Sequence, residues 1–299
     1  MALDEAGGSL QCETMSTREQ QGSFHCQDRE LAYRVYGEGS RVTVLLHGLL
    51  LSQRMHVPLA RALAERGNRV VTLDLLGHGQ SDRSPDMWRY SMGIFANQVV
   101  GLLDHLEVDE AIVGGTSLGA NVTLEVASLA PERLRGMVVE MPVLDNALLA
   151  CAIAFTPLMV ALTFGEPVMR LAARGARMVP SGVGPLLADV GLDTIRQEPG
   201  PSAAVLHGLF FGRTAPHKAV RRTLAAPTLV IGHQRDPIHP FSDSDALVAE
   251  LPDATLVQAS SILELRISPE RLTGEIGDFL DTCWKARRRG GASRARRVA

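Results

Sequence analysis

The chain has 299 residues, of which 45% are hydrophobic and 21% are charged, with a formal net charge of −3. This is enough apolar sequence for a large core in one α/β domain with an insertion, or in two small domains. The small negative charge excludes a general electrostatic attraction to nucleic acid.

Both ends of the chain differ from its middle. Residues 1–22 are polar and mixed, and we predict that they are disordered. Residues 285–299 carry seven basic residues and no acid, which predicts a disordered tail, with weak contact to anionic lipid or nucleic acid as the alternative. No basic segment followed by an apolar stretch marks a signal peptide, and the four cysteines form no C-x-x-C pair. We therefore expect a cytoplasmic protein with reduced thiols and no zinc site.

Predicted strands and helices alternate along the chain. An antiparallel pair at 23–26 and 30–36 opens the fold. Further strands are predicted at 42–46, 69–73, 111–113, 136–140, 227–232 and 254–258. Helices are predicted at 55–66, 90–106, 117–130, 242–251 and 268–284, the last one capped by Ser268. This alternation predicts an α/β fold, with a mostly parallel sheet covered by helices on both faces.

An apolar insertion separates the two halves of this pattern. The core is predicted at 23–143 and 223–284, and a helical lid at 144–222. Within the lid, Leu148 to Phe164 is almost wholly apolar, but it is too short for a membrane span and contains Pro157. A second apolar piece runs from Ala203 to Phe211. The lid is expected to cover a pocket for an uncharged, hydrophobic small molecule; a membrane-leaning surface or an oligomer contact is the alternative.

Residues 115–119 carry the pattern G-x-S-x-G, with Gly115, Ser117 and Gly119 between a predicted strand and a predicted helix. A strand that turns sharply into a helix holds its apex residue in a strained conformation, and the chain packs so closely that only glycine fits on either side. The pattern therefore predicts a nucleophile elbow with Ser117 exposed above the helix N-terminus.

Two more motifs precede the elbow. His47-Gly48 follows the 42–46 strand, and Asp74 to Asp82 reads D-x-x-G-H-G-x-S-D. In this order the motifs resemble the α/β-hydrolase family over about residues 23 to 284. The resemblance implies Ser117 as nucleophile and the backbone N–H groups of Leu49 and Leu118 as oxyanion donors. It also implies structural roles for His47 and His78.

The resemblance also implies an acid and a histidine. Asp236, after the 227–232 strand, matches the family's acid, with Glu140 and Asp145 as alternatives. The family's histidine is expected near Ser261 or Ile262, but no histidine follows His239. We therefore predict that His239, three residues after Asp236, replaces it. His233, His207 and His217 are weaker candidates.

These observations lead to two functional hypotheses. The first is a serine hydrolase of a hydrophobic carboxylic ester or related acyl compound, with an atypical or incomplete triad. The second is a non-hydrolytic relative, either a hydrophobic small-molecule binder in which Ile262 fills the vacant space, or a cofactor-free lyase or isomerase. Neither hypothesis requires a metal or an organic cofactor, and the oligomeric state and the substrate stay open.

Overall fold

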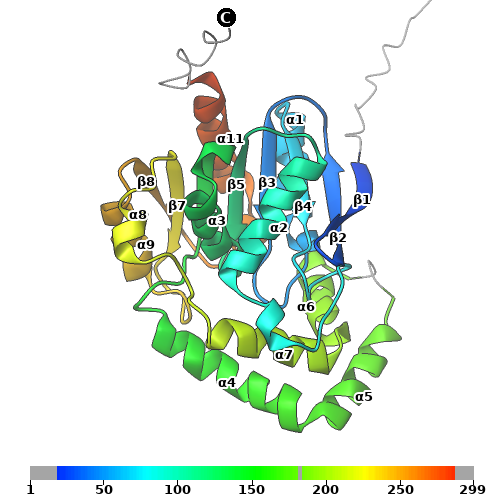
Figure 1. Cartoon of the computed structure of the whole chain (residues 1–299). Helices are drawn as coiled ribbons and strands as arrows, with labels where there is room; N and C mark the ends of the chain where they lie inside the picture. The colour runs from blue at the N-terminus through cyan, green and yellow to red at the C-terminus, as the bar shows by residue number, and fades with distance from the viewer. Residues whose placement is uncertain (1–18, 181–183, 287–299) are drawn as a thin grey trace, which may run out of the picture.

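A twisted sheet of eight strands forms the centre of the computed structural model, which describes residues 19–180 and 184–286 (Figure 1). Its strand order is β1-β2-β4-β3-β5-β6-β7-β8. The strands β3 to β8 run parallel, whereas β2 is antiparallel to both β1 and β4. Their bounds are β1 Glu19–Cys26, β2 Arg29–Tyr36, β3 Val42–Leu46, β4 Arg69–Leu73, β5 Ala111–Thr116, β6 Leu134–Glu140, β7 Thr228–His233 and β8 Ala254–Ala259. The mostly parallel sheet predicted from the sequence is confirmed.

Helices cover both faces of this sheet. Successive side chains of a strand point to opposite faces, so Val44 and Leu46 of β3 belong to one apolar cluster and Leu45 belongs to the other. The first cluster is covered by α2 Met92–His105, α3 Leu118–Leu129 and α9 Phe241–Glu250. The second is covered by α1 Val57–Glu65 and α11 Glu270–Lys285. Short helical turns connect these elements: η1 Gln53–His56, η2 Met87–Arg89, η3 Pro131–Arg133 and α10 Glu264–Ile267.

The ends of the described chain differ from the prediction. Strand β1 begins at Glu19, so residues 19–22 are not part of a disordered tail. They pair with Tyr33 to Tyr36 of β2, and their polar composition reflects an exposed edge strand. At the other end, α11 extends through Lys285, and Ser268 makes no cap hydrogen bond because α10 lies directly before it. The predicted tails at 1–18 and 287–299 lie outside the described residues.

The helical insertion follows β6, as predicted. It comprises α4 Leu148–Phe164, α5 Glu166–Arg177, α6 Leu186–Arg196, α7 Pro199–Phe210 and α8 Lys218–Arg221. We call residues 144–222 the lid. In Figure 1 the lid crosses the end of the sheet at which the parallel strands finish, with α7 between α4 and the sheet.

Two side chains of the core hold the lid in place. Asn121 of α3 donates to the carbonyl groups of Val143 and Thr214, each at 2.7 Å, and accepts the Val143 N–H at 3.0 Å. Asp243 of α9 is fully buried and accepts the N–H groups of Leu144, Asn146 and Ala147. The first of these links joins both ends of the insertion to α3, the helix that directly follows Ser117.

Candidate active site

Ser117 lies at a sharp turn between β5 and α3. Its backbone has φ 54° and ψ −107°, a conformation that L-residues rarely adopt. Its N–H donates to the Glu140 carbonyl of β6 at 2.9 Å. A Cβ at Gly115 would lie 2.4 Å from the Gly119 backbone, and a Cβ at Gly119 would lie 2.2 Å from the Leu46 carbonyl oxygen. The two glycines are therefore required by close backbone approach, and the serine is held at the apex.

A chain of two hydrogen bonds joins Ser117 to the loop after β7. The Ser117 Oγ and the His239 Nε2 are 2.8 Å apart, and the His239 Nδ1 is 2.8 Å from the Asp236 Oδ2. The structure thus brings together the serine, histidine and acid named from the sequence. The histidine comes from the same loop as the acid rather than from the loop after β8.

The Asp236 carboxylate is held by the loop that it belongs to. Its Oδ1 accepts the N–H groups of Ile238 at 2.8 Å and His239 at 2.9 Å, which leaves Oδ2 for the imidazole. Burial by itself would raise the pKa of Asp236, but the hydrogen bonds from His239 and Ile238 outweigh it and lower the pKa below its ordinary value. The group is therefore ionised at neutral pH and orients the His239 ring.

Two backbone segments beside Ser117 could supply oxyanion donors. Leu118 is the first residue of α3, and the first N–H groups of a helix have no partner within it. Leu49 follows β3, the strand beside β5, and is a central residue of the turn closed by the Leu51 N–H on the Gly48 carbonyl at 3.1 Å. Leu50, the other central residue, has φ 57°, as a type II turn requires.

Two side chains of the lid form hydrogen bonds to this turn. The Leu50 carbonyl accepts a hydrogen bond from the Thr194 Oγ1 at 2.9 Å and another from the Gln197 Nε2 at 2.8 Å. Both donors come from the end of α6 and the residue that follows it. The orientation of the turn that carries Leu49 therefore depends on the lid, and nothing in the sequence pattern pointed to these two residues.

His47 and His78 make structural contacts. The Leu75 N–H donates to the His47 Nε2 at 3.0 Å, so the neutral ring carries its proton on Nδ1 and donates to the Gly48 carbonyl at 2.8 Å. His78 contacts the Leu76 carbonyl through Nδ1 at 3.0 Å. Burial lowers the pKa of both histidines, that of His78 strongly, so both stay neutral. His47 connects the loops after β3 and β4, and His78 bonds within its own loop and packs against the His47 ring.

The other acids and histidines considered from the sequence are not part of the hydrogen-bonded chain at Ser117. Glu140 pairs with Arg266 at 2.7 Å and accepts the Thr116 hydroxyl at 2.5 Å, and Asp145 is exposed. His233 contacts the Ser261 carbonyl and His207 the Ala203 carbonyl, while His217 caps α8.

The position at which the family places its histidine carries no base. Ser261 is exposed, and Ile262 has 39% of its surface exposed. Ile262 therefore lies at the surface, and its role in the space left by the histidine stays a prediction.

Comparison with known proteins identifies the fold. Residues 42–159 match the model described as alpha/beta hydrolase fold. The chain is 36% identical over 105 residues to the dihydrolipoyllysine-residue acetyltransferase component of an acetoin cleaving system from Pseudomonas putida, a match over 35% of this chain and 28% of that protein. It is 31% identical over 104 residues to the 2-hydroxymuconate semialdehyde hydrolase of a Pseudomonas species, over 35% of this chain and 33% of that protein. The aligned segment thus spans a third or less of these curated relatives.

A solved structure extends the likeness to most of the chain. A thermophilic esterase from Thermogutta terrifontis superposes with a TM-score of 0.70 over 88% of this chain and 99% of that one, at 21% identity. The chain has the α/β-hydrolase fold.

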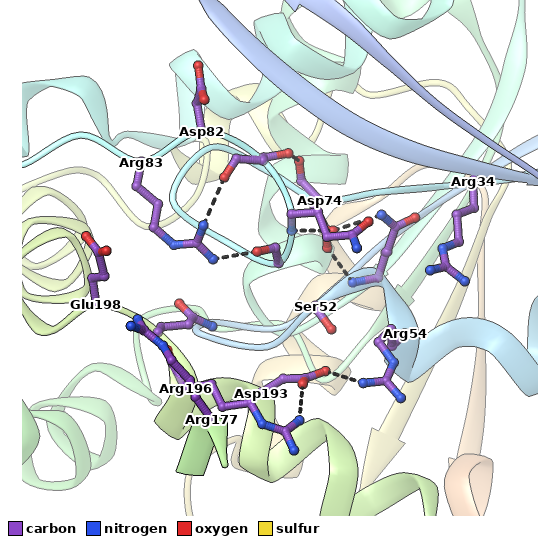
Figure 2. A pocket seen from close by; sticks show the side chains of 15 residues that line it. Arg34, Ser52, Arg54, Asp74, Asp82, Arg83, Arg177, Asp193, Arg196 and Glu198 are labelled. Atoms are coloured by element: carbon purple, nitrogen blue, oxygen red, sulfur yellow. Dashed lines mark hydrogen bonds and ion pairs between the residues drawn. The ribbon is translucent and has the colours of Figure 1, made fainter. Parts of the chain in front are cut away.

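The protein also has a polar cavity away from Ser117. A cavity of about 870 Å³ lies between α6, the loops after β3 and β4, and Arg34 of β2. Figure 2 shows Asp193 between Arg54 and Arg196, each at 2.7 Å, and Arg83 turned toward backbone carbonyls of its own loop. Of these guanidinium groups, that of Arg54 joins the core to the lid through Asp189 and Asp193, and Ser117 does not line the cavity.

Proposed function

We propose that the protein is a serine hydrolase that cleaves a hydrophobic carboxylic ester or a related acyl compound. The observation that carries this proposal is the continuous chain from Ser117 Oγ to His239 Nε2 and from His239 Nδ1 to Asp236 Oδ2, with 2.8 Å at each step. A serine hydroxyl needs such a base because its own pKa lies far above neutrality. The esterase and semialdehyde hydrolase named above support the same reaction class.

The geometry supports a two-step mechanism. The His239 Nε2 accepts the Ser117 proton while Oγ attacks the acyl carbon, and the N–H groups of Leu49 and Leu118 stabilise the oxyanion. His239 then donates the proton to the leaving alcohol, which departs from the acyl-enzyme. In the second step His239 takes a proton from water, which attacks the acyl carbon. His239 then returns the proton to the Ser117 Oγ as the bond between Oγ and the acyl carbon breaks and the carboxylic acid leaves. Asp236 stays ionised throughout and stabilises the imidazolium.

The lid supports a hydrophobic substrate. Helix α4 has no charged residue, and Phe155, Leu158 and Met159 on its inner side pack against the apolar core cluster. An acyl chain that enters between this helix and the core would contact apolar side chains and would not have to displace an ion pair.

The first test compares three single variants in the hydrolysis of p-nitrophenyl butyrate. Ser117→Ala and His239→Gln should each lower kcat/KM by at least about 10³-fold, because each removes one part of the proton-transfer chain. His233→Gln is the matched control, since His233 is a buried histidine at the end of β7 that contacts Ser261 instead. Its kcat/KM should stay within a few-fold of the wild type.

Covalent labelling separates the two functional hypotheses. A fluorophosphonate should label the wild type at Ser117 in a 1:1 ratio, and His239→Gln should label far more slowly. Unchanged ester turnover in Ser117→Ala would exclude Ser117 as the nucleophile. A wild type that is not labelled, but is stabilised against heat by hydrophobic small molecules, would favour the non-hydrolytic binder.

A further inference from the structure

Helix α4 is apolar all round yet lies at the surface of the molecule. It contains no charged residue from Leu148 to Phe164, and Leu162 is its one buried residue. A helix of this composition is normally enclosed by protein or by lipid. In Figure 1, α4 and α5 form the outermost layer of the lid, on the side away from the sheet.

The exposed side chains of α4 lie along one stripe. Leu149, Ile153, Val160 and Phe164 have 72%, 68%, 47% and 83% of their surface exposed. Their spacing of i, i+4, i+11 and i+15 places them on one face of an α-helix. The stripe therefore runs the whole length of α4 and faces solvent, while the opposite face packs on the lid and core.

Helix α5 continues the stripe and adds positive charge beside it. Val168, Leu171 and Met178, at i, i+3 and i+10, are strongly exposed, while Ala173 is buried on the other side. Arg170 and Arg174 are exposed beside this face and, with Ala173, line a groove between α5 and the start of α7. Helix α5 carries three arginines and one acid, Glu166, which pairs with Arg170.

An apolar stripe bordered by arginines fits the surface of an anionic bilayer. Apolar side chains partition into the boundary between headgroups and acyl chains, and cationic side chains next to them bind anionic headgroups. A second copy of the chain on the same surface would bring its own arginines against these arginines. Within residues 19–180 and 184–286 no single helix is long and apolar enough to cross a membrane, and α4 and α5 meet at 97°. This geometry favours lying on a bilayer over spanning it.

We propose that α4 and α5 form a docking surface for anionic lipid bilayers. The side chains of Leu149, Ile153 and Phe164 enter the boundary of the acyl chains, and Arg170 and Arg174 contact the headgroups. The lid side of the sheet, where Ser117 lies, then faces the membrane. This proposal stands independently of the hydrolase activity, because its test measures binding alone.

The test is flotation of the full chain with vesicles. Vesicles of phosphatidylcholine with about 30% phosphatidylglycerol should carry the wild type to the top of a density gradient. The double variant Ile153→Glu/Phe164→Glu should lose at least about tenfold in partitioning. The variant Arg170→Gln/Arg174→Gln should lose roughly 30-fold on anionic vesicles, at about 1 kcal/mol for each arginine, and little on pure phosphatidylcholine.

The matched control is Leu129→Glu, which changes an exposed leucine at the end of α3, far from the lid. It should bind as the wild type does. A wild type that fails to float, or equal binding by Ile153→Glu/Phe164→Glu, would overturn the proposal. A third outcome would also overturn it: the wild type is a dimer, the double variant is a monomer, and neither protein binds vesicles.

A second measurement avoids dependence on the folding of the charged variant. Phe164→Trp keeps the stripe apolar and adds a fluorophore to it. The fluorescence of the added tryptophan is obtained by subtracting the wild-type spectrum. It should shift to the blue on anionic vesicles and be quenched by brominated acyl chains. An unchanged spectrum with bound protein would place the contact elsewhere and contradict the proposal.

Discussion

Glu140 and Arg266 form a buried ion pair next to the backbone of the proposed nucleophile. The Arg266 Nη2 lies 2.7 Å from the Glu140 Oε2, and the Glu140 carbonyl accepts the Ser117 N–H. Burial would raise the pKa of Glu140, but the Arg266 charge and the hydrogen bonds around the carboxylate lower it well below the ordinary value. The pair therefore keeps a charged carboxylate inside the protein at neutral pH.

Arg266→Met should destabilise the protein by about 3–5 kcal/mol at pH 7, because it leaves the Glu140 carboxylate buried without its partner. The pH dependence should change sign. In the wild type the lowered pKa gives stability above about pH 4.3, the unfolded value, which is lost as the pH falls through the folded pKa. In the variant burial raises the Glu140 pKa, so stability should increase as the pH falls from 8 to 5.

Urea unfolding at several pH values measures both effects. Arg61→Met is the control, since Arg61 is largely exposed and pairs with Glu19 at the sheet edge. An exposed pair of this kind contributes about 0–1 kcal/mol. An equally small loss in Arg266→Met would show that the buried pair does not matter for stability.

At the scale of the elements, α6 of the lid fixes the turn after β3. Thr194 and Gln197 both donate to the Leu50 carbonyl, and Leu50 has a positive φ that costs a leucine energy. The same turn carries the Leu49 N–H, one of the two proposed oxyanion donors. A lid that moves away would release the turn and with it the donor.

Thr194→Val/Gln197→Leu should therefore lower kcat about 10- to 100-fold with little change in KM, because the donor acts on the transition state. Thr163→Val is the control, since Thr163 donates to the Met159 carbonyl within α4 and touches no part of the site. Steady-state kinetics with p-nitrophenyl butyrate measure kcat and KM separately and so test this prediction. A rise in KM alone would mean that the two residues act on substrate entry and not on the oxyanion turn.

At the scale of the whole molecule, the lid and the core meet through apolar packing and through a few polar links. Asn121 holds both ends of the insertion, and Asp243 holds its first turn. Arg54 joins η1 to Asp189 and Asp193 of α6. These polar contacts lie near the edges of the lid, whereas Val205 and Leu206 of α7 are buried in the core cluster. Loss of one polar link should therefore loosen the lid while the sheet stays intact.

Asn121→Ala should increase the local opening of the lid more than that of the core. It leaves the Val143 N–H and two carbonyl groups without their partner, at about 1–3 kcal/mol for a buried group. Amide hydrogen exchange should become faster in α4 and α7, with β5 and β6 unchanged. Asn146→Ala, at an exposed side chain beside the lid entrance, should leave exchange as in the wild type. Equal acceleration throughout the sheet would indicate global destabilisation instead.

Much of the fold was predictable because its signals are local. Apolar runs of five or six residues between turn motifs predicted the strands, and the glycines around Ser117 predicted the elbow. The register of Glu19 to Gly22 was missed because a polar edge strand has no apolar alternation to mark it. The positive φ of Leu50 was also missed, since a turn of this type normally carries glycine there.

The sequence by itself determined which groups are available: a serine at a strained apex, and an acid and a histidine three residues apart in one loop. Only the tertiary structure decided that His239 faces Ser117, because 122 residues separate them and no local pattern encodes their distance. The same holds for Gln197 on the Leu50 carbonyl, 147 residues away. Such contacts arise where parallel strands end side by side, and the order of strands in the sheet sets which loops meet.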